Sequence, residues 1–209
     1  MTAGEHAAPE DIAADFDPFA GAALARVVPT TEPQREIWLA AKLEPDASLA
    51  YNEAVAIRLK GTLDVDKLRI ALQRLIERHE ALRSTITPDG ADLCVAEAVS
   101  IDCPLLDLSG LDEAARADAM AEAERRAVET PFDLEQGPLI RAELLRLGRD
   151  EHLLIVAAHH IVCDGWSFGV AARDLGALYA ETLGGPAPVP PDSFADSRQT
   201  VAKSAIASA

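Results

Sequence analysis

Two adjacent histidines followed by an aspartate and a glycine form the segment of this sequence best suited to chemistry. His159 and His160 end an apolar run, and Asp164 and Gly165 follow within a short turn. A neutral imidazole, with its ordinary pKa of ~6.5, can take a proton from an amine or a hydroxyl near neutral pH. His160 lies nearest the turn and is therefore the candidate for proton handling or for positioning a substrate.

The two histidines cannot line one pocket if the strand that carries them is regular. Successive side chains of a strand point to opposite faces of the sheet, so we expect His159 to have a structural role. Asp164 either holds the tautomer of the His160 imidazole or pairs with an arginine and fixes the turn. Gly165 would give the turn a φ that other residues resist.

Three other interpretations of this segment stay open. Histidines at strand ends are most often polar groups with satisfied hydrogen bonds. His160, Cys163 and Asp164 could act as metal ligands, but no fourth ligand stands at a familiar offset. Cys163 could be a nucleophile, although nothing near it indicates a lowered thiol pKa. We expect no bound metal, and we expect Cys163 to fill space in the core.

The surrounding pattern predicts the elements that must position this segment. Apolar stretches at 139–147 and 152–159 predict a hairpin of buried strands that ends at the histidines. Helices and strands mix without a regular βαβ rhythm, which predicts an α+β fold, a two-layer sandwich. The other predicted elements are a helix that begins at the capping pattern of Thr31 and Gln34, a strand at 51–59, a helix capped by Asp64 or Asp66, a hairpin over 82–99, a helix at 111–129 and a helix after Gly165.

Composition limits the class of protein. The chain has 209 residues, of which 49% are hydrophobic, enough for one large or two small domains. Its formal charge of −16 argues against nucleic acid and anionic membrane surfaces as partners. No apolar run approaches the ~20 residues of a membrane span, and the first residues lack the features of a signal peptide. We expect a cytoplasmic protein whose three cysteines, which include no CxxC pair, are reduced.

The histidine segment and three others resemble one enzyme family. HHIVCDGWS, at 159–167, resembles the HHxxxDG signature of nonribosomal peptide synthetase condensation domains, which have a chloramphenicol acetyltransferase-like fold. Ordered matches are much harder to obtain by chance than one short motif. The other matching segments are TTEPQREIWL, which ends at Leu39, RHEALRS at 78–84, and PFDL with GPL between 131 and 139.

The resemblance implies an acyltransferase that forms an amide bond. Such domains join an acyl or peptidyl thioester, carried on an upstream carrier protein, to the amine of an aminoacyl group on a downstream peptidyl carrier protein. The thioesters are held on phosphopantetheine arms, so no cofactor is expected to bind this chain directly. The segment after residue 30 also resembles domains that follow polyketide modules.

The resemblance also assigns roles to individual residues. His160 would face the tunnel of the family's fold, and Gly165 would place its backbone beside the reacting thioester. His159 would be structural. Asp164 would belong to a structural ion pair, with Arg83 its likeliest partner and Arg78 the next. Sequence does not decide whether His160 removes a proton from the amine or orients it.

The length of the chain departs from the family. Condensation domains have two lobes that flank a tunnel, and this chain has the length of one. We therefore expect 1–27 to be an acidic leader or linker, 28–185 the amino-terminal lobe, and 186–209 a Pro-rich spacer and tail toward a missing carboxy-terminal lobe. A lone lobe should be inactive or weakly active and prone to self-association through its uncovered apolar face. An epimerisation-type domain and a non-catalytic carrier-docking fragment are the rival interpretations.

Overall fold

The computed structural model describes residues 23–188. Most of the predicted leader and nearly all of the predicted spacer and tail lie outside these residues. The elements in chain order are β1 (Leu24–Pro29), α1 (Glu32–Leu43), α2 (Pro45–Leu49), β2 (Asn52–Lys60), α3 (Val65–Arg78), the short helix η2 (Glu80–Arg83), β3 (Ser84–Ile86), β4 (Asp92–Ala96), β5 (Leu105–Asp107), α4 (Glu113–Glu129), β6 (Ile140–Gly148), β7 (Glu151–His159) and α5 (Gly165–Thr182).

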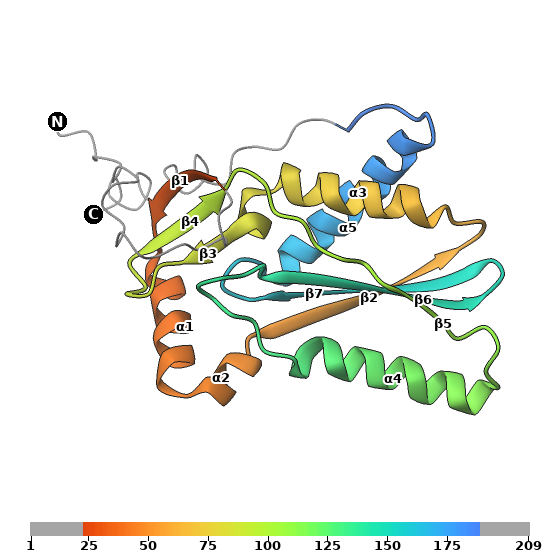
Figure 1. Ribbon diagram of the computed structural model, residues 1–209, viewed down its shortest axis with the longest axis horizontal. Coiled ribbons are helices and arrows are strands. Elements are labelled where there is room, and N and C mark those ends of the chain that lie inside the picture. Colours follow the sequence, from red (N-terminus) through yellow and green to blue (C-terminus); the bar gives the residue numbers. More distant parts are fainter. Residues whose placement is uncertain (1–22, 189–209) are drawn as a thin grey trace.

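A four-stranded sheet in the order β2-β7-β6-β5 forms the centre of the molecule (Figure 1). β7 pairs antiparallel with β2 and with β6, and β5 pairs parallel with β6. Both neighbours of β7 are strands, and all of its side chains from His152 to His159 are buried. The buried hairpin predicted from the apolar stretches is confirmed.

Helices cover both faces of this sheet. On one face, Leu154, Val156 and Ala158 of β7 belong to the core cluster that also holds the apolar stripes of α3 and α5. On the other face, Leu153, Ile155 and Ala157 pack with residues of α4. Figure 1 shows α3 and α5 on one side of the sheet and α4 on the other. The α+β class is confirmed, and α4 adds a layer to the predicted two-layer sandwich.

A second, three-stranded sheet in the order β1-β4-β3 packs beside the first. Its strand β1 begins at Leu24, so the last four residues of the predicted leader belong to the fold, and that boundary was wrong. Val27 and Val28 are buried where β1 pairs with β4. The sequence does not predict this short strand, because Val27 and Val28 are its only adjacent buried apolar residues and they directly follow an acidic, Ala-rich segment.

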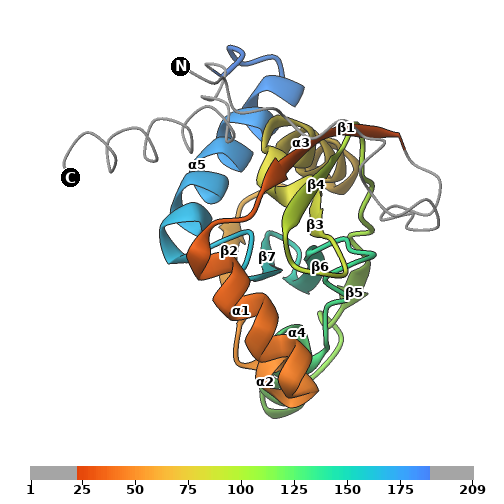
Figure 2. The same cartoon turned by 90° about the vertical axis from the view of Figure 1, so that its left-hand side faces the viewer.

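Helix α1 begins where the sequence predicts. Gln34 completes the capping box with Thr31, and Glu32 adds an acidic residue to the first turn. Trp38 packs against Gly90, whose φ is +72°, and a Cβ at that glycine would lie 2.4 Å from the indole ring. Figure 2 shows α1 leading from the end of β1 toward α2. Within residues 23–188, none of the helices combines the length and the apolar character that crossing a bilayer requires.

Candidate active site

The two histidines at the end of β7 lie in different surroundings. His159 is 0% exposed, and its Nδ1 accepts a hydrogen bond from the Ile161 backbone N–H at 3.3 Å. The proton of the neutral ring therefore lies on Nε2, which is 3.3 Å from Ser48 Oγ. Burial lowers the pKa of His159 to about 4, so this ring is neutral at physiological pH.

Aromatic rings complete the enclosure around His159. Tyr51 lies at 6.1 Å and Phe132 at 6.3 Å between ring centroids. The guanidinium of Arg141 stacks on Phe132, 3.6 Å from its centroid. We call His159, Ser48, Tyr51 and Phe132 the closed pocket. It gives the first histidine a packing and hydrogen-bonding environment in which the ring has no exposed surface. Ser48 and Phe132 also line a hollow of about 270 Å³ that His159 does not line.

His160 lies at the edge of the sheet. Its backbone N–H donates to the Tyr51 carbonyl at 2.8 Å, and its side chain is 37% exposed. Glu53 Oε1, from β2, lies 2.6 Å from Nδ1 of the ring, an ion-pair distance without in-line hydrogen-bond geometry. Because Nδ1 itself is shielded from solvent, the exposed part of the ring comprises other atoms.

The backbone after the histidines is held by α1. The His159 carbonyl accepts from the N–H groups of Val162 at 3.0 Å and Cys163 at 3.3 Å, which closes the turn. The buried side chain of Gln34 donates from Nε2 to the Ile161 carbonyl at 2.9 Å. The amide that completes the cap of α1 therefore also supports the turn that follows His160.

Asp164 is the N-cap of α5. Its Oδ1 accepts from the Ser167 backbone N–H at 2.8 Å and from Ser167 Oγ at 2.6 Å. These hydrogen bonds, with a smaller contribution from nearby His160, lower the pKa of Asp164. Asp164 is exposed, so it does not form the buried ion pair predicted from the resemblance.

The arginines predicted as partners of Asp164 contact other groups. Arg83 donates to the Ala96 carbonyl and lies 3.7 Å from Glu80, while Arg78 Nε donates to Asp174 Oδ2 at 2.9 Å. His79 Nε2 also lies 3.0 Å from Asp174 Oδ2. The prediction that Arg83 or Arg78 pairs with Asp164 is wrong in this structure. The carboxylate that Arg78 contacts is that of Asp174, which is buried in the middle of α5, whereas Asp164 lies at the start of that helix.

Gly165 is the first residue of α5 and does not adopt a left-handed conformation, contrary to the prediction. As the first residue of a helix, Gly165 needs only an ordinary helical φ, which any residue can adopt. A Cβ added to it would meet no described atom within 4 Å. Trp166, the next residue, is 83% exposed, so it does not pack in the core of this chain. We call His160, Asp164, Gly165 and Trp166 the open edge.

The thiol at Cys163 is unsuited to nucleophilic attack. Burial, and then the neighbouring carboxylates Asp164 and Glu53, raise its pKa to about 12. All three cysteines are buried and free. Among residues 23–188, no three His, Cys, Asp or Glu side chains come together as a metal site would require. The chemistry available at the open edge is that of an imidazole flanked by carboxylates.

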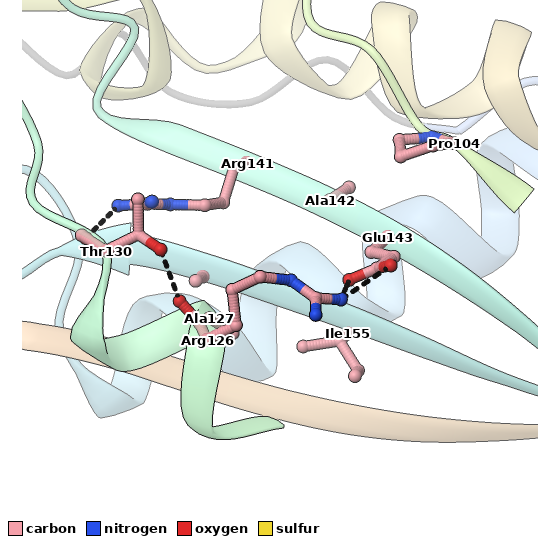
Figure 3. A pocket seen from close by; sticks show the side chains of 9 residues that line it. Pro104, Arg126, Ala127, Thr130, Arg141, Ala142, Glu143 and Ile155 are labelled. Atoms are coloured by element: carbon pink, nitrogen blue, oxygen red, sulfur yellow. Dashed lines mark hydrogen bonds and ion pairs between the residues drawn. The ribbon is translucent and has the colours of Figure 1, made fainter. Parts of the chain in front are cut away.

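A hollow of about 300 Å³ lies on the other face of the sheet, beside α4 (Figure 3). Arg126 spans it to Glu143 with contacts of 2.9 and 2.7 Å, and Arg141 donates to the Thr130 carbonyl at 2.7 Å. None of the site residues predicted from the sequence lines it. It is separate from the open edge.

Sequence reasoning missed the residues that support the histidines from other elements. Gln34 was identified only as a helix cap, and Ser48 and Glu53 were not considered. The one available signal was at Glu53, a charged residue in the same alternating row as Val55 and Ile57. The alternating pattern does not predict which strand pairs with this one, or which residue of that strand lies beside Glu53.

Comparisons with known proteins agree with the motifs. Residues 24–206 match the family model of the condensation domain. Chondramide synthase cmdD of Chondromyces crocatus is 42% identical over 177 residues, which are 82% of this chain and 4% of that protein. The dimodular nonribosomal peptide synthase of Bacillus subtilis (strain 168) is 40% identical over 163 residues, which are 77% of this chain and 7% of that protein.

Solved structures share the fold. The starter condensation domain of rhizomide synthetase RzmA matches with a TM-score of 0.75 and 27% identity, over 86% of this chain and 45% of that one. SgcC5 from Streptomyces globisporus matches with a TM-score of 0.71 and 28% identity, over 82% of this chain and 41% of that one. The chain thus spans less than half of these solved proteins and a few per cent of the synthetases. It belongs to the condensation-domain family.

Proposed function

We propose that this chain supplies one side of a condensation active site that forms an amide bond in nonribosomal peptide synthesis. The amine of one carrier-bound aminoacyl group would attack the thioester carbonyl of an acyl or peptidyl group on another carrier. The observation that carries this proposal is the partly exposed ring of His160, within the family motif and beside Glu53 and Asp164. Location in the cytoplasm stays a prediction from the sequence.

The reaction needs one bond made, one bond broken and one proton moved. The amine nitrogen bonds to the thioester carbon, the carbon–sulfur bond breaks, and the sulfur leaves as a thiolate. A proton must come off the nitrogen, and a proton must reach the sulfur. His160 can accept the proton from the nitrogen and then donate it to the sulfur. Alternatively, it can hold the amine in line with the thioester carbonyl.

Gly165 and Trp166 are proposed to contact groups from outside this chain. A Cβ at Gly165 would meet no described atom within 4 Å, so a substrate has room beside this backbone. The exposed indole of Trp166 would be covered by a second lobe. The relatives match this chain over less than half of their length, which supports such a lobe. In its absence the uncovered indole would favour self-association.

The proposed substrates are thioesters on phosphopantetheine arms of an upstream acyl or peptidyl carrier and a downstream peptidyl carrier. Support comes from a solved variant of the RzmA starter condensation domain in complex with C8-CoA and Leu-SNAC. That variant matches this chain with a TM-score of 0.67 and 27% identity.

The test uses this chain joined to the carboxy-terminal half of a related condensation domain, with an acyl-loaded donor carrier and an aminoacyl-loaded acceptor carrier. His160→Ala should lower amide formation ~10²–10⁴-fold, the contribution typical of a general base. Glu151→Gln, at the other end of β7, is the control and should retain the native rate. Unchanged amide yield in His160→Ala would remove His160 from the mechanism. Carrier binding without turnover by the native protein would favour the docking interpretation.

A further inference from the structure

Glu53 breaks the apolar pattern of β2 at the point nearest His160. Val55, Ile57 and Leu59 of this strand pack against the core on the α3 and α5 face of the sheet. Glu53 is two residues before Val55 and shares its face. A carboxylate therefore occupies an inward-facing row at the end of the strand, where an apolar side chain would extend the core.

Strand register brings this carboxylate to the histidine. Glu53 pairs with Ala158, and the backbone of His160 is bound to Tyr51 across the same pair of strands. The Glu53 carboxylate and His160 Nδ1 are 2.6 Å apart, and the two side chains are 36% and 37% exposed. Among the residues that the structure describes, His160 supplies the only side-chain nitrogen within ion-pair distance of the Glu53 carboxylate. Each of the two side chains retains enough exposure to align a hydrogen bond by turning.

The other titratable groups around His160 do not compete for its Nδ1. Asp164 Oδ1 is bound to Ser167 at the start of α5, and Cys163 is a neutral thiol because its pKa is raised. His159 is a neutral ring on the opposite face of the sheet. Among these groups, Glu53 is the one that contacts the ring.

We propose that Glu53 is a positioning residue that keeps the proton of neutral His160 on Nδ1 and so leaves the lone pair of Nε2 for the acceptor amine. The inference rests on the proposed function. When Nε2 takes the amine proton, the ring becomes a cation beside the Glu53 carboxylate, which stabilises it. The same proton then leaves Nε2 for the departing sulfur, so the ring and the carboxylate return to their starting states.

Imidazole nitrogen-15 spectra of the 209-residue chain test the tautomer directly. The His160 signals are assigned by their loss in His160→Ala, and spectra are recorded at mildly alkaline pH, where imidazoles are neutral. Native His160 should show a protonated Nδ1 and an unprotonated Nε2. His159 should show the reverse, because its Nδ1 accepts from the Ile161 N–H. It serves as the internal reference.

Glu53→Ala should shift the His160 signals toward the Nε2-protonated form and leave those of His159 unchanged. The matched control is Glu151→Ala, which removes a similarly exposed glutamate that pairs with Arg58 across the same two strands. It should leave both rings unchanged. A native His160 protonated on Nε2, or a Glu53→Ala spectrum like that of the native chain, would overturn the proposal.

Turnover in the completed domain separates this proposal from the proposed function. Glu53→Ala should lower kcat about tenfold or more with little change in the KM of the acceptor, since it removes part of the ~10²–10⁴-fold general-base contribution. Glu53→Gln retains an acceptor oxygen without the charge and should preserve the tautomer while lowering kcat. If the spectra behave as expected but His160→Ala keeps its full rate, the tautomer control stands and the proposed function fails. A native kcat in Glu53→Ala would overturn the positioning role.

Discussion

The closed pocket and the open edge are one residue apart in the chain but differ in every property that decides what an imidazole can do. His159 is 0% exposed, neutral and bonded at both ring nitrogens to groups of this chain. His160 is 37% exposed and has one nitrogen beside a carboxylate. The end of β7 produces this difference: His159, its last residue, places its ring among the aromatic side chains, and His160, in the turn that follows, lies at the sheet edge.

The difference separates stability from chemistry. A ring enclosed by Ser48, Tyr51 and Phe132 can contribute packing and hydrogen bonds but cannot meet a substrate. A ring at the edge contributes little to packing, and its exposed atoms remain free to meet a group from outside this chain. Each consequence can be tested by changing one histidine and leaving the other.

The largest expected effect is on the stability of the closed pocket. His159→Ala should lower the free energy of unfolding by about 3–5 kcal/mol, because it opens a cavity and leaves the Ile161 N–H without its acceptor. His160→Ala should change it by about 0.5 kcal/mol or less, as at other exposed sites. Denaturant unfolding followed by circular dichroism measures both. Equal losses would mean that the two rings are buried alike.

A somewhat smaller effect is expected from pH. The pKa of His159 falls from the ordinary 6.5 to about 4 in the folded chain, so between these values only the unfolded chain takes up the proton. Stability should therefore be full above pH 6.5 and should decline as the pH falls toward 4, by about 3 kcal/mol.

His159→Gln isolates this contribution of the closed pocket. Burial also lowers the pKa of His79, which adds a pH dependence of the same sign in both proteins. The difference between native and variant unfolding curves across this pH range should therefore report His159 alone. Parallel curves for the two proteins would show that the His159 ring is not held neutral by burial.

A smaller loss of stability is expected at Asp164, on the open edge. Asp164→Ala removes an exposed N-cap and should cost about 1 kcal/mol of unfolding free energy. Asp174→Ala is the matched control on the same helix, and it should cost about 3–5 kcal/mol because Arg78 and His79 lose a buried carboxylate. Thermal unfolding compares the two. Equal losses would restore the buried ion pair that the family resemblance implied for Asp164.

Local patterns predicted most of the fold. Periodicity and caps located α1, α3, α4 and α5, and the apolar stretches located the hairpin of β6 and β7. Alternation predicted that the two histidines would differ in their surroundings, and they do, although His160 lies just beyond the end of β7. These features depend on residues close together in the chain, which is where sequence patterns carry physical information.

The sequence did not predict features that depend on contacts between distant segments. The short elements β5 and α2 are too brief to show a period, and β5 joins the sheet only through parallel pairing with β6. The choice of Asp174 over Asp164 as the partner of Arg78 depends on how α5 lies across α3. Glu53 depends on strand register in the same way. Such choices are made by tertiary packing, which no local pattern encodes.

The hydrogen bond from Gln34 to the Ile161 carbonyl has a consequence for engineering synthetases. The Gln34 side chain supports two elements that are far apart in sequence, the start of α1 and the turn after His160. An exchange of α1 between related domains therefore also exchanges a hydrogen-bond donor to that turn. A recombination boundary placed between α1 and β7 would take Gln34 from one parent and Ile161 from the other. Chimeras that retain both members from one parent should therefore preserve the loop that presents His160.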